Sequence, residues 1–353
     1  MKKTNMIKVL IVDDSKVVQE FMKHILTSDP DIQIVGIASS GHEAIELASK
    51  MRPDVISMDF HMPDMNGCDA ARTIMETTPT PIVIVTASLS REDVIKNFNP
   101  YENGVLAVLL RPPGMQHPDF VTASNMLIQT LKQMSKIKVV SLFPPCIKEQ
   151  IGTPRLLQKF ENDLKRIQVI AIGASTGGPR ALQRILSGLP KDLPVPVLIV
   201  QHITAGFGKG FMEWVSATAG IKLKIAEEGE QISAGIGYIA PDNFHMGVSQ
   251  GSKINLGNQP PENGLKPSVS YLFRSVAQTF GPNALGVLLT GMGKDGADEL
   301  KEMKDKGAIT LVQNEESSVV FSISAEAIKT GASDHILSIE KISDFFKVLV
   351  KSN

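Results

Sequence analysis

The segment Gly173-Ala174-Ser175-Thr176-Gly177-Gly178 is a serine set among glycines, and the patterns on either side of it indicate the local fold. The apolar and β-branched run at residues 167–172 comes directly before it and predicts a buried strand. Pro179 and the apolar spacing of residues 181–186 follow it and predict a helix. The glycines therefore mark a sharp turn where a parallel strand meets the N-terminus of a helix, and Ser175 stands in that turn.

The position of Ser175 allows two interpretations. The segment fits the G-x-S-x-G arrangement that exposes a nucleophilic serine, and the helix end offers N–H groups and a positive dipole to a developing oxyanion. A glycine-rich turn of this kind also binds phosphate groups. A dinucleotide site is disfavoured, because the glycine spacing is G-x-x-x-G-G rather than G-x-G-x-x-G.

The composition is that of an ordinary globular protein. The chain has 353 residues, 42% hydrophobic and 21% charged, with a formal net charge of −1, and its length suffices for two domains. The sequence shows no basic excess for nucleic acid, no apolar run long enough for a membrane span and no signal peptide. Its two cysteines, Cys68 and Cys146, predict no disulfide framework, so we expect a cytoplasmic protein.

Strand and helix patterns alternate in two series. The first predicts strands at residues 8–12, 32–38, 55–58, 82–85 and 105–110 and a last helix at residues 120–134. The second predicts strands at residues 169–172, 197–201, 237–239, 285–289 and 308–312. The proline-containing residues 136–166 between them predict a linker. We therefore expect an α/β fold with two doubly wound parallel-sheet domains, at residues 1–135 and 167–353.

Charged and polar side chains follow the strands of the first series. Asp13 and Asp14 end the first strand, Asp59 follows the third, Thr86 follows the fourth and Arg111 follows the fifth. The carboxyl ends of parallel strands meet at one sheet edge, where three carboxylates repel one another unless a cation such as Mg²⁺ lies between them. A carboxylate beside that ion can attack a phosphoryl group, whose oxygens a hydroxyl and a cation stabilise. The alternative is that the aspartates cap the following helices.

With Met62-Pro63-Asp64-Met65-Asn66-Gly67 after Asp59, residues 7–134 resemble the receiver domain of two-component response regulators. The resemblance implies a flavodoxin-like fold in which Asp59 is the phospho-acceptor. It also implies a Mg²⁺ site and contacts to the phosphoryl group. The residues implied for Mg²⁺ are Asp13, Asp14, Asp59 and the backbone carbonyl of His61, and those implied for the phosphoryl group are Thr86 and Arg111.

Two residues depart from the receiver pattern. Arg111 stands where the family usually has Lys, and its planar head is wider than an ammonium group. Val108 stands where the family usually has an aromatic residue that rotates on activation. A receiver that keeps only a docking role is therefore the alternative to the usual switch mechanism.

The second series also carries polar groups at its strand ends. His202 follows the strand at residues 197–201, and Asp295 lies in a glycine-rich loop after the strand at residues 285–289. A serine nucleophile needs a base and the base needs an orienting carboxylate, so Ser175, His202 and Asp295 form a candidate triad. His335 is a rival base, although residues 333–337 indicate the start of a strand. Each group is also compatible with an ordinary structural or turn role.

Several segments of the second series occur together in one order. They are the one around Ser175, Gln201-His202, Ala240-Pro241 with His245-Met246, Lys266-Pro267-Ser268-Val269, and Thr290 through Asp295-Gly296. On these segments, residues 167–349 resemble the catalytic domain of the chemotaxis protein-glutamate methylesterases, the CheB family. The resemblance implies a Rossmann-like domain with Ser175 as nucleophile, His202 as base and Asp295 as orienting acid. One segment, Ser322-Ile323-Ser324, departs from the Gly-Met-Pro that the family tends to have.

The two resemblances together imply phosphorylation-regulated hydrolysis of glutamate methyl esters on chemotaxis receptors, and deamidation of glutamines, through an acyl-enzyme. The backbone N–H groups of Thr176 and Met292 are the oxyanion candidates. Mg²⁺ serves the receiver, and the esterase needs no cofactor. The implied partners are methyl-accepting chemotaxis receptors and the chemotaxis histidine kinase, without nucleic acid or membrane insertion. The alternatives are a partner-binding output domain without catalysis and a serine esterase of another substrate.

Overall fold

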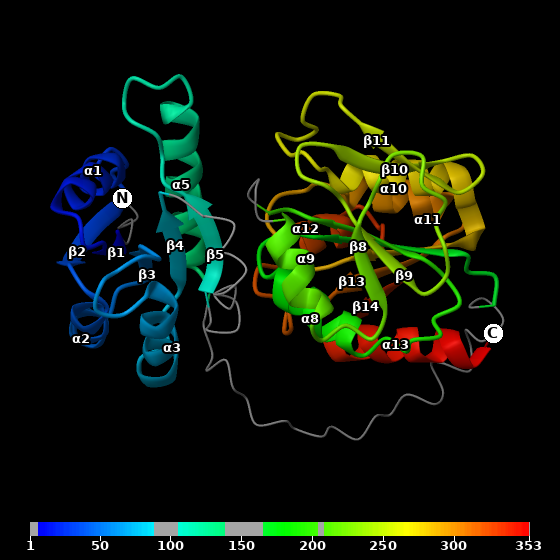
Figure 1. Ribbon diagram of the computed structural model, residues 1–353, viewed down its shortest axis with the longest axis horizontal. Helices are drawn as coiled ribbons and strands as arrows, with labels where there is room; N and C mark the ends of the chain where they lie inside the picture. Colours follow the sequence, from blue (N-terminus) through cyan, green and yellow to red (C-terminus); the bar gives the residue numbers. More distant parts are fainter. Residues whose placement is uncertain (1–5, 88–104, 138–164, 204–207, 353) are drawn as a thin grey trace. The chain divides into compact units, whose positions relative to one another are not determined.

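The structure is a computed structural model that describes residues 6–87, 105–137, 165–203 and 208–352. The chain divides into two compact units, residues 1–148 and 149–353 (Figure 1). The division falls within the segment 136–166 that the sequence predicts as a linker. Residues 138–164, with Cys146 and the polar run before Arg166, lie outside the described residues, so the boundaries at 135 and 167 stay predictions.

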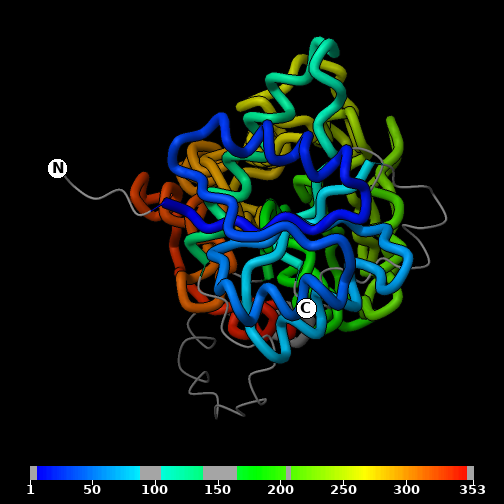
Figure 2. The backbone as a smooth tube through the Cα atoms, turned by 90° about the vertical axis from the view of Figure 1, so that its left-hand side faces the viewer, coloured from blue at the N-terminus to red at the C-terminus, as the bar shows by residue number. Residues whose placement is uncertain are grey.

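The first unit is a five-stranded parallel sheet with the strand order β2-β1-β3-β4-β5. Helices α1 and α5 pack together on one face, and α2 and α3 pack together on the other (Figure 1). The blue and cyan parts of the tube in Figure 2 trace this alternation of strands and helices. The elements are β1 (Ile7–Val12), α1 (Lys16–Leu26), β2 (Ile32–Ala38), α2 (Gly41–Met51), β3 (Val55–Met58), α3 (Gly67–Thr77), β4 (Ile82–Thr86), β5 (Val105–Leu110) and α5 (Phe120–Met134).

The strands of this sheet are apolar because helices cover both faces. β3 and β4 are buried along their whole length. All five predicted strands and the helix at residues 120–134 are present. Because β1, β3, β4 and β5 are consecutive neighbours, the residues that follow them meet at one edge of the sheet.

The second unit is a seven-stranded sheet with the order β14-β13-β12-β6-β7-β9-β8, parallel throughout. An antiparallel hairpin, β10–β11, packs against α10. The elements are β6 (Val169–Ala174), α8 (Gly178–Ser187), β7 (Val197–Gln201), α9 (Gly208–Ser216), β8 (Lys222–Ile225), β9 (Ile236–Ile239), β10 (His245–Ser249), β11 (Lys253–Gly257), α10 (Val269–Phe280), a 3₁₀ turn (Gly281–Asn283), β12 (Ala284–Leu288), α11 (Ala297–Asp305), β13 (Ile309–Gln313), α12 (Ser322–Lys329), β14 (His335–Leu337) and α13 (Ile339–Ser352).

The order of these strands creates a switch point beside β6. From β6 the chain passes to its neighbour β7, then to the edge strand β8, and back to β9, which lies between β7 and β8. It then runs through the hairpin and α10 to β12, on the other side of β6, and winds outward through β13 and β14. Helices α8, α9 and α13 cover one face, while α10, α11 and α12 cover the other. In such open sheets, ligands bind in the crevice at the carboxyl ends of the strands on either side of the switch point, here β6 and β12.

The fold class is confirmed, with two parallel α/β sheets. The five strands predicted in the second series are present, and β14 confirms that residues 333–337 lead into a strand. Sequence analysis missed β8, a half-buried edge strand, and the hairpin β10–β11. The hairpin buries Met246, Val248 and Ile254, but its two short strands mix these residues with polar residues and glycine, so they lack the continuous apolar run of a central strand.

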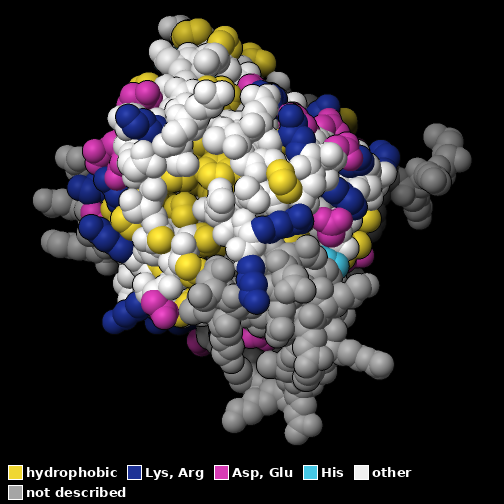
Figure 3. Space-filling model, turned by 90° about the vertical axis from the view of Figure 1, so that its right-hand side faces the viewer, with side chains coloured by type: hydrophobic (Ala, Val, Ile, Leu, Met, Phe, Trp, Pro, Cys, Tyr) yellow, Lys and Arg dark blue, Asp and Glu magenta, His cyan; other side chains and the backbone are white. Residues whose placement is uncertain are grey.

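Acidic and basic side chains are mixed over the face in view in Figure 3, with hydrophobic side chains between them. This mixture agrees with the formal net charge of −1 for the whole chain. Within the described ranges, no helix combines the length and the apolar character that crossing a membrane requires.

Candidate active site and acidic cluster

Ser175 lies in the turn that the sequence predicts, between the end of β6 at Ala174 and the start of α8 at Gly178. Its N–H donates to the carbonyl of Thr290 at 3.1 Å, and its own carbonyl accepts from the N–H of Gly178 at 2.8 Å. Gly177 has a φ of 79°, and a Cβ there would lie 2.4 Å from the Cβ of Val319. Glycine is therefore required at 177 for both conformation and space.

His202 follows β7, the neighbour of β6. Its N–H donates to the carbonyl of Ala174 at 2.9 Å, which ties the residue after β7 to the residue before Ser175. Its ring atom Nε2 lies 2.9 Å from Oδ2 of Asp295, and the two side chains are 7% and 1% exposed. Asp295 stands in the loop after β12, the other neighbour of β6. The three predicted triad residues thus follow three adjacent strands at the switch point.

The carboxylate of Asp295 is surrounded by donors. Oδ2 accepts from the backbone N–H of Val269 at 2.7 Å as well as from His202. Oδ1 accepts from Oγ of Ser268 at 2.7 Å, from Nδ2 of Asn263 at 3.2 Å and from the N–H of Ser270 at 3.4 Å. Burial by itself raises the pKa of Asp295, but these donors, led by His202, hold that pKa well below its usual value.

An ionised Asp295 fixes the tautomer of His202. The carboxylate can only accept, so Nε2 carries the imidazole proton and Nδ1 holds the lone pair. Nδ1 is buried, and no described residue forms a hydrogen bond with it. The ring therefore offers an oriented, unoccupied proton acceptor, which is what a general base requires.

The loops with the two oxyanion candidates are pinned to each other. Oγ1 of Thr290 lies 3.0 Å from the carbonyl of Thr176. The N–H groups on either side of Met292 are bound, since Gly291 donates to the carbonyl of Val320 at 2.9 Å and Gly293 to Oγ of Ser322 at 3.2 Å. Residues 322–324, which differ from the usual family sequence, form the start of α12. Through the bond between Ser322 and Gly293, this segment contacts the loop that carries Met292.

The rival base His335 lies at the start of β14. Three steps in the strand order separate β14 from β6, about 14 Å at the usual spacing between strands. The start of a parallel strand also faces the opposite edge from the one that Ser175 occupies. This placement favours His202 over His335 as the base.

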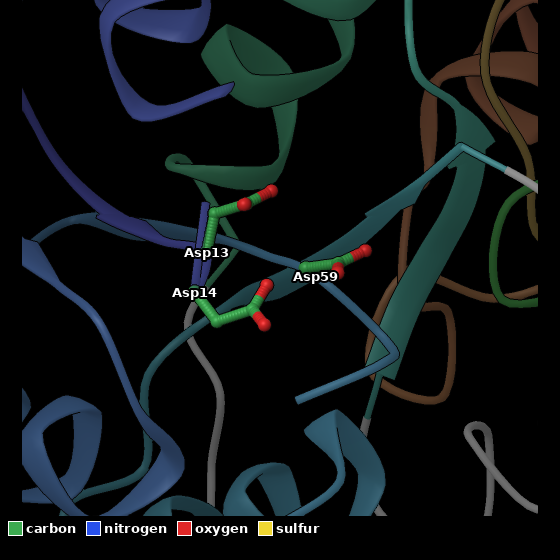
Figure 4. Close-up of side chains that lie close together, drawn as sticks. All are labelled: Asp13, Asp14 and Asp59. Carbon is green, nitrogen blue, oxygen red and sulfur yellow. The ribbon is translucent and has the colours of Figure 1, made fainter. Parts of the chain in front are cut away.

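The first unit carries an acidic cluster at the end of β1 and β3. Single ligand atoms of Asp13, Asp14 and Asp59 all lie within 4.8 Å of one another (Figure 4). Helix capping does not explain them, because the N-cap residues of α1 and α3 are Ser15 and Asn66. The cluster is consistent with a Mg²⁺ site, since this ion takes oxygen ligands of this kind.

The cluster is short of positive charge. Burial, followed by the neighbouring carboxylates, raises the pKa of Asp13 to about 6, against the opposing effects of the Ser15 N–H and of Arg111. Burial also raises the pKa of Asp59. Nη1 of Arg111 lies 3.7 Å from Oδ2 of Asp13, too far for a hydrogen bond. These carboxylates fit a cation bound among them.

The other predicted receiver residues lie at the same sheet edge. Thr86 ends β4 and is buried, and its carbonyl accepts from the N–H of Arg111 at 2.8 Å. His61 is exposed after β3, where its ring packs edge-on against Phe60. Val108 is buried on β5, opposite Ile84 of β4. The roles of these residues stay predictions.

Sequence reasoning missed the groups that hold Asp295 in place. Ser268 is the N-cap of α10, and the first N–H groups of that helix point at the carboxylate. A serine after a proline and before a helical pattern was the available signal, although it predicts only a cap. It does not reveal that Asp295, 27 residues further on, shares the same helix end.

Comparison with known proteins extends along nearly the whole chain. Residues 9–112 match the response regulator receiver domain, and residues 170–346 match the CheB methylesterase family. The chain is 46% identical over 346 residues to protein-glutamate methylesterase/protein-glutamine glutaminase 4 of Geobacter metallireducens, which covers 96% of this chain and 97% of the relative. It is 49% identical over 350 residues to the corresponding protein 1 of Syntrophus aciditrophicus, covering 98% of each.

A solved structure supports the same assignment for the second unit. The crystal structure of the Thermotoga maritima CheB methylesterase catalytic domain matches with a TM-score of 0.50 and 34% identity. It covers 52% of this chain and 98% of that domain. The chain therefore belongs to the CheB family of protein-glutamate methylesterases/protein-glutamine glutaminases, in which a response regulator receiver domain precedes the methylesterase domain.

Proposed function

We propose that Ser175, His202 and Asp295 form the catalytic triad of this protein, and that its substrates are glutamate methyl esters and glutamines of chemotaxis receptors. The chain is a protein-glutamate methylesterase/protein-glutamine glutaminase regulated by its receiver domain. The observation that carries the triad is the buried pair of His202 and ionised Asp295, bonded at 2.9 Å at the switch point beside Ser175. A domain that only binds a partner has no need of such a pair.

The first half of the reaction forms an acyl-enzyme. Oγ of Ser175 attacks the ester carbonyl carbon while Nδ1 of His202 takes the hydroxyl proton. Negative charge develops on the carbonyl oxygen, where the N–H groups of Thr176 and Met292 receive it. The tetrahedral intermediate then collapses, and His202 gives its proton to the departing methanol. With glutamine as substrate, the departing group is ammonia.

The second half restores the enzyme. Water attacks the acyl carbon, and Nδ1 of His202 takes a proton from it. The ester bond to Ser175 breaks, the serine oxygen regains the proton, and glutamate is released. Asp295 stays ionised throughout and stabilises the imidazolium form of His202 in both halves.

The receiver chemistry follows from the acidic cluster. Asp59 accepts the phosphoryl group from a histidine kinase, and Thr86 and Arg111 bind the transferred oxygens. Asp13, Asp14, Asp59 and the carbonyl of His61 would hold Mg²⁺, which supplies the positive charge that the cluster lacks. Phosphorylation of Asp59 raises the esterase activity of the second unit.

The experiment is methanol release from methylated receptor membranes by the full chain, with a phosphoryl donor and Mg²⁺. We expect release by the wild type and none above background from Ser175→Ala. Ser187→Ala, which changes a serine at the end of α8, is the matched control and should keep full release. Undiminished release by Ser175→Ala would refute the serine mechanism. No release from any variant would indicate another substrate or a binding role.

A further inference from the structure

The buried side chain of Gln201 joins the two residues that carry the proposed chemistry. Nε2 of Gln201 lies 2.9 Å from the carbonyl oxygen of Ser175 and 2.7 Å from the carbonyl oxygen of His202. Both neighbours are acceptors, so this atom is the amide nitrogen and donates one proton to each. One side chain thus links the backbone of the nucleophile to that of the base.

The bond to the Ser175 carbonyl also sets the direction of a neighbouring donor. In a trans peptide, the C=O of one residue and the N–H of the next point in opposite directions. Gln201 and the N–H of Gly178 both hold the Ser175 carbonyl, the latter at 2.8 Å. The N–H of Thr176, an oxyanion candidate, is therefore aimed the opposite way, out of the turn.

The fold accommodates the Gln201 amide beside a glycine and, within the described part of the chain, leaves one of its polar atoms without a hydrogen bond. A Cβ on Gly178 would lie 2.1 Å from Oε1 of Gln201, so the glycine that starts α8 is what admits the side chain. Gln201 is 4% exposed, and Oε1 is buried with no hydrogen-bond partner among the described residues. An unsatisfied buried acceptor lowers stability, which argues against stability as the reason for glutamine here.

We infer that Gln201 is a positioning residue that holds the Ser175–Thr176 peptide and the backbone of His202 in catalytic register, so that the Thr176 N–H meets the oxyanion. This inference rests on the proposed function of Ser175 and His202. Gln201 itself touches no reacting atom. Its removal should therefore reduce stabilisation of the tetrahedral intermediate and leave substrate binding intact.

The test compares full-length wild type with Gln201→Met, which keeps the length of the side chain and removes the donor. Removing Oε1 as well eliminates an unsatisfied acceptor, so we expect the thermal midpoint to stay within about 4 °C of the wild type. We expect kcat for methanol release to fall about 10- to 100-fold with KM within about twofold, since a misaligned oxyanion donor costs on this scale.

Phenylboronic acid supplies a second readout, because it forms an anionic tetrahedral adduct with a nucleophilic serine. We expect its affinity for Gln201→Met to fall by about the same factor as kcat/KM. Thr310→Val is the matched control. Thr310 is fully buried on β13, where its hydroxyl donates to the carbonyl of Ala332 at 2.6 Å, so this variant should lose stability and keep kcat.

The outcomes separate this inference from the proposed function. Wild-type kcat in folded Gln201→Met, or a lower kcat with unchanged boronate affinity, overturns the role of Gln201 while Ser175→Ala still reports on the triad. Activity that survives Ser175→Ala overturns both. If Gln201→Met does not fold, Gln201→Leu gives the same comparison, since its apolar side chain cannot donate to the two carbonyls.

Discussion

The two sites of this chain both contain buried carboxylates, and their surroundings shift the pKa values in opposite directions. Asp295 accepts hydrogen bonds from a histidine, an asparagine, a serine hydroxyl and two N–H groups, and its pKa is held well below the usual value. The pKa of Asp13 is raised to about 6, and that of Asp59 is raised as well. In both sites burial is the largest effect and raises the pKa, so the number of donors decides the net direction.

The opposite pKa shifts distinguish a site whose buried charge is compensated by the protein itself from one whose charge is not. The esterase site carries its own compensation, because α10 directs its first N–H groups at Asp295. In the receiver cluster, Nη1 of Arg111 lies 3.7 Å from Oδ2 of Asp13, beyond hydrogen-bond distance. A carboxylate site with too few donors is suited to a cation and to a phosphoryl group that arrive from outside.

The largest effect is expected for Asp295→Asn, which removes the carboxylate that the esterase site compensates. The amide places two donors among groups that already donate, so the His202 ring loses its tautomer and orientation. We expect kcat to fall roughly 10⁴-fold, as for a triad carboxylate that becomes an amide. Asp334→Asn is the control. Asp334 also accepts a backbone N–H, from Thr310 at 2.9 Å, yet it stands away from the triad, so kcat should stay unchanged. A fall below tenfold for Asp295→Asn would mean that the carboxylate is not an orienting acid.

Chelation of divalent cations distinguishes the two sites, because phosphoryl incorporation should require a cation and methanol release should not. With EDTA present, we expect the full chain to incorporate no phosphoryl group from a small acyl phosphate, since the cluster then lacks its cation. Basal methanol release without a phosphoryl donor should stay the same. Asp59→Asn should remove incorporation even with Mg²⁺ present. Phosphoryl transfer that continues in EDTA would contradict the assignment of Asp13, Asp14 and Asp59 to a metal site.

The smallest expected effect is on stability, and its sign differs between the sites. A folded pKa of about 6 against 3.8 means that Asp13 binds its proton more tightly in the folded state. The stabilisation from the protonated form is complete below about pH 4 and is lost as the pH rises through about 6. At pH 7 without Mg²⁺, Asp13→Asn should therefore stabilise the first unit by about 2–3 kcal/mol.

The same substitution at Asp295 should destabilise the second unit at pH 7. The pKa of Asp295 is lower in the folded than in the unfolded state, so the ionised carboxylate stabilises the fold at any pH above its unfolded-state pKa. This stability is lost only as the pH falls through the folded-state pKa. Fluorescence of Trp214, the one tryptophan of the chain, follows urea unfolding of the second unit. Hydrogen exchange of β1 and α1 peptides follows the first. Destabilisation by both variants would show that the pKa shifts do not describe the two sites.

Local sequence patterns predicted most of the helices and strands and the polar residues at their ends, although they missed β8 and the hairpin β10–β11. Glycines after residues 167–172 place Ser175 in a strand-to-helix turn, and parallel topology brings strand-end groups such as Asp13 and Asp59 to one edge. Such patterns are local, because side-chain periodicity and turn chemistry act over a few residues. They predicted the fold class and the candidate residues of both sites, but they left His335 as a rival to His202, and the resemblance to the CheB family decided between the two bases.

How those residues meet depends on the tertiary fold. Nothing local reveals that β12 returns to lie beside β6, which puts Asp295 within 2.9 Å of His202, 93 residues away in sequence. The same holds for the helix end that lowers the pKa of Asp295 and for the Gln201 amide that bonds Ser175 and His202. Hydrogen bonds and burial depend on groups that are close in space. The pKa values and the positions of the site residues are therefore defined only in the complete fold.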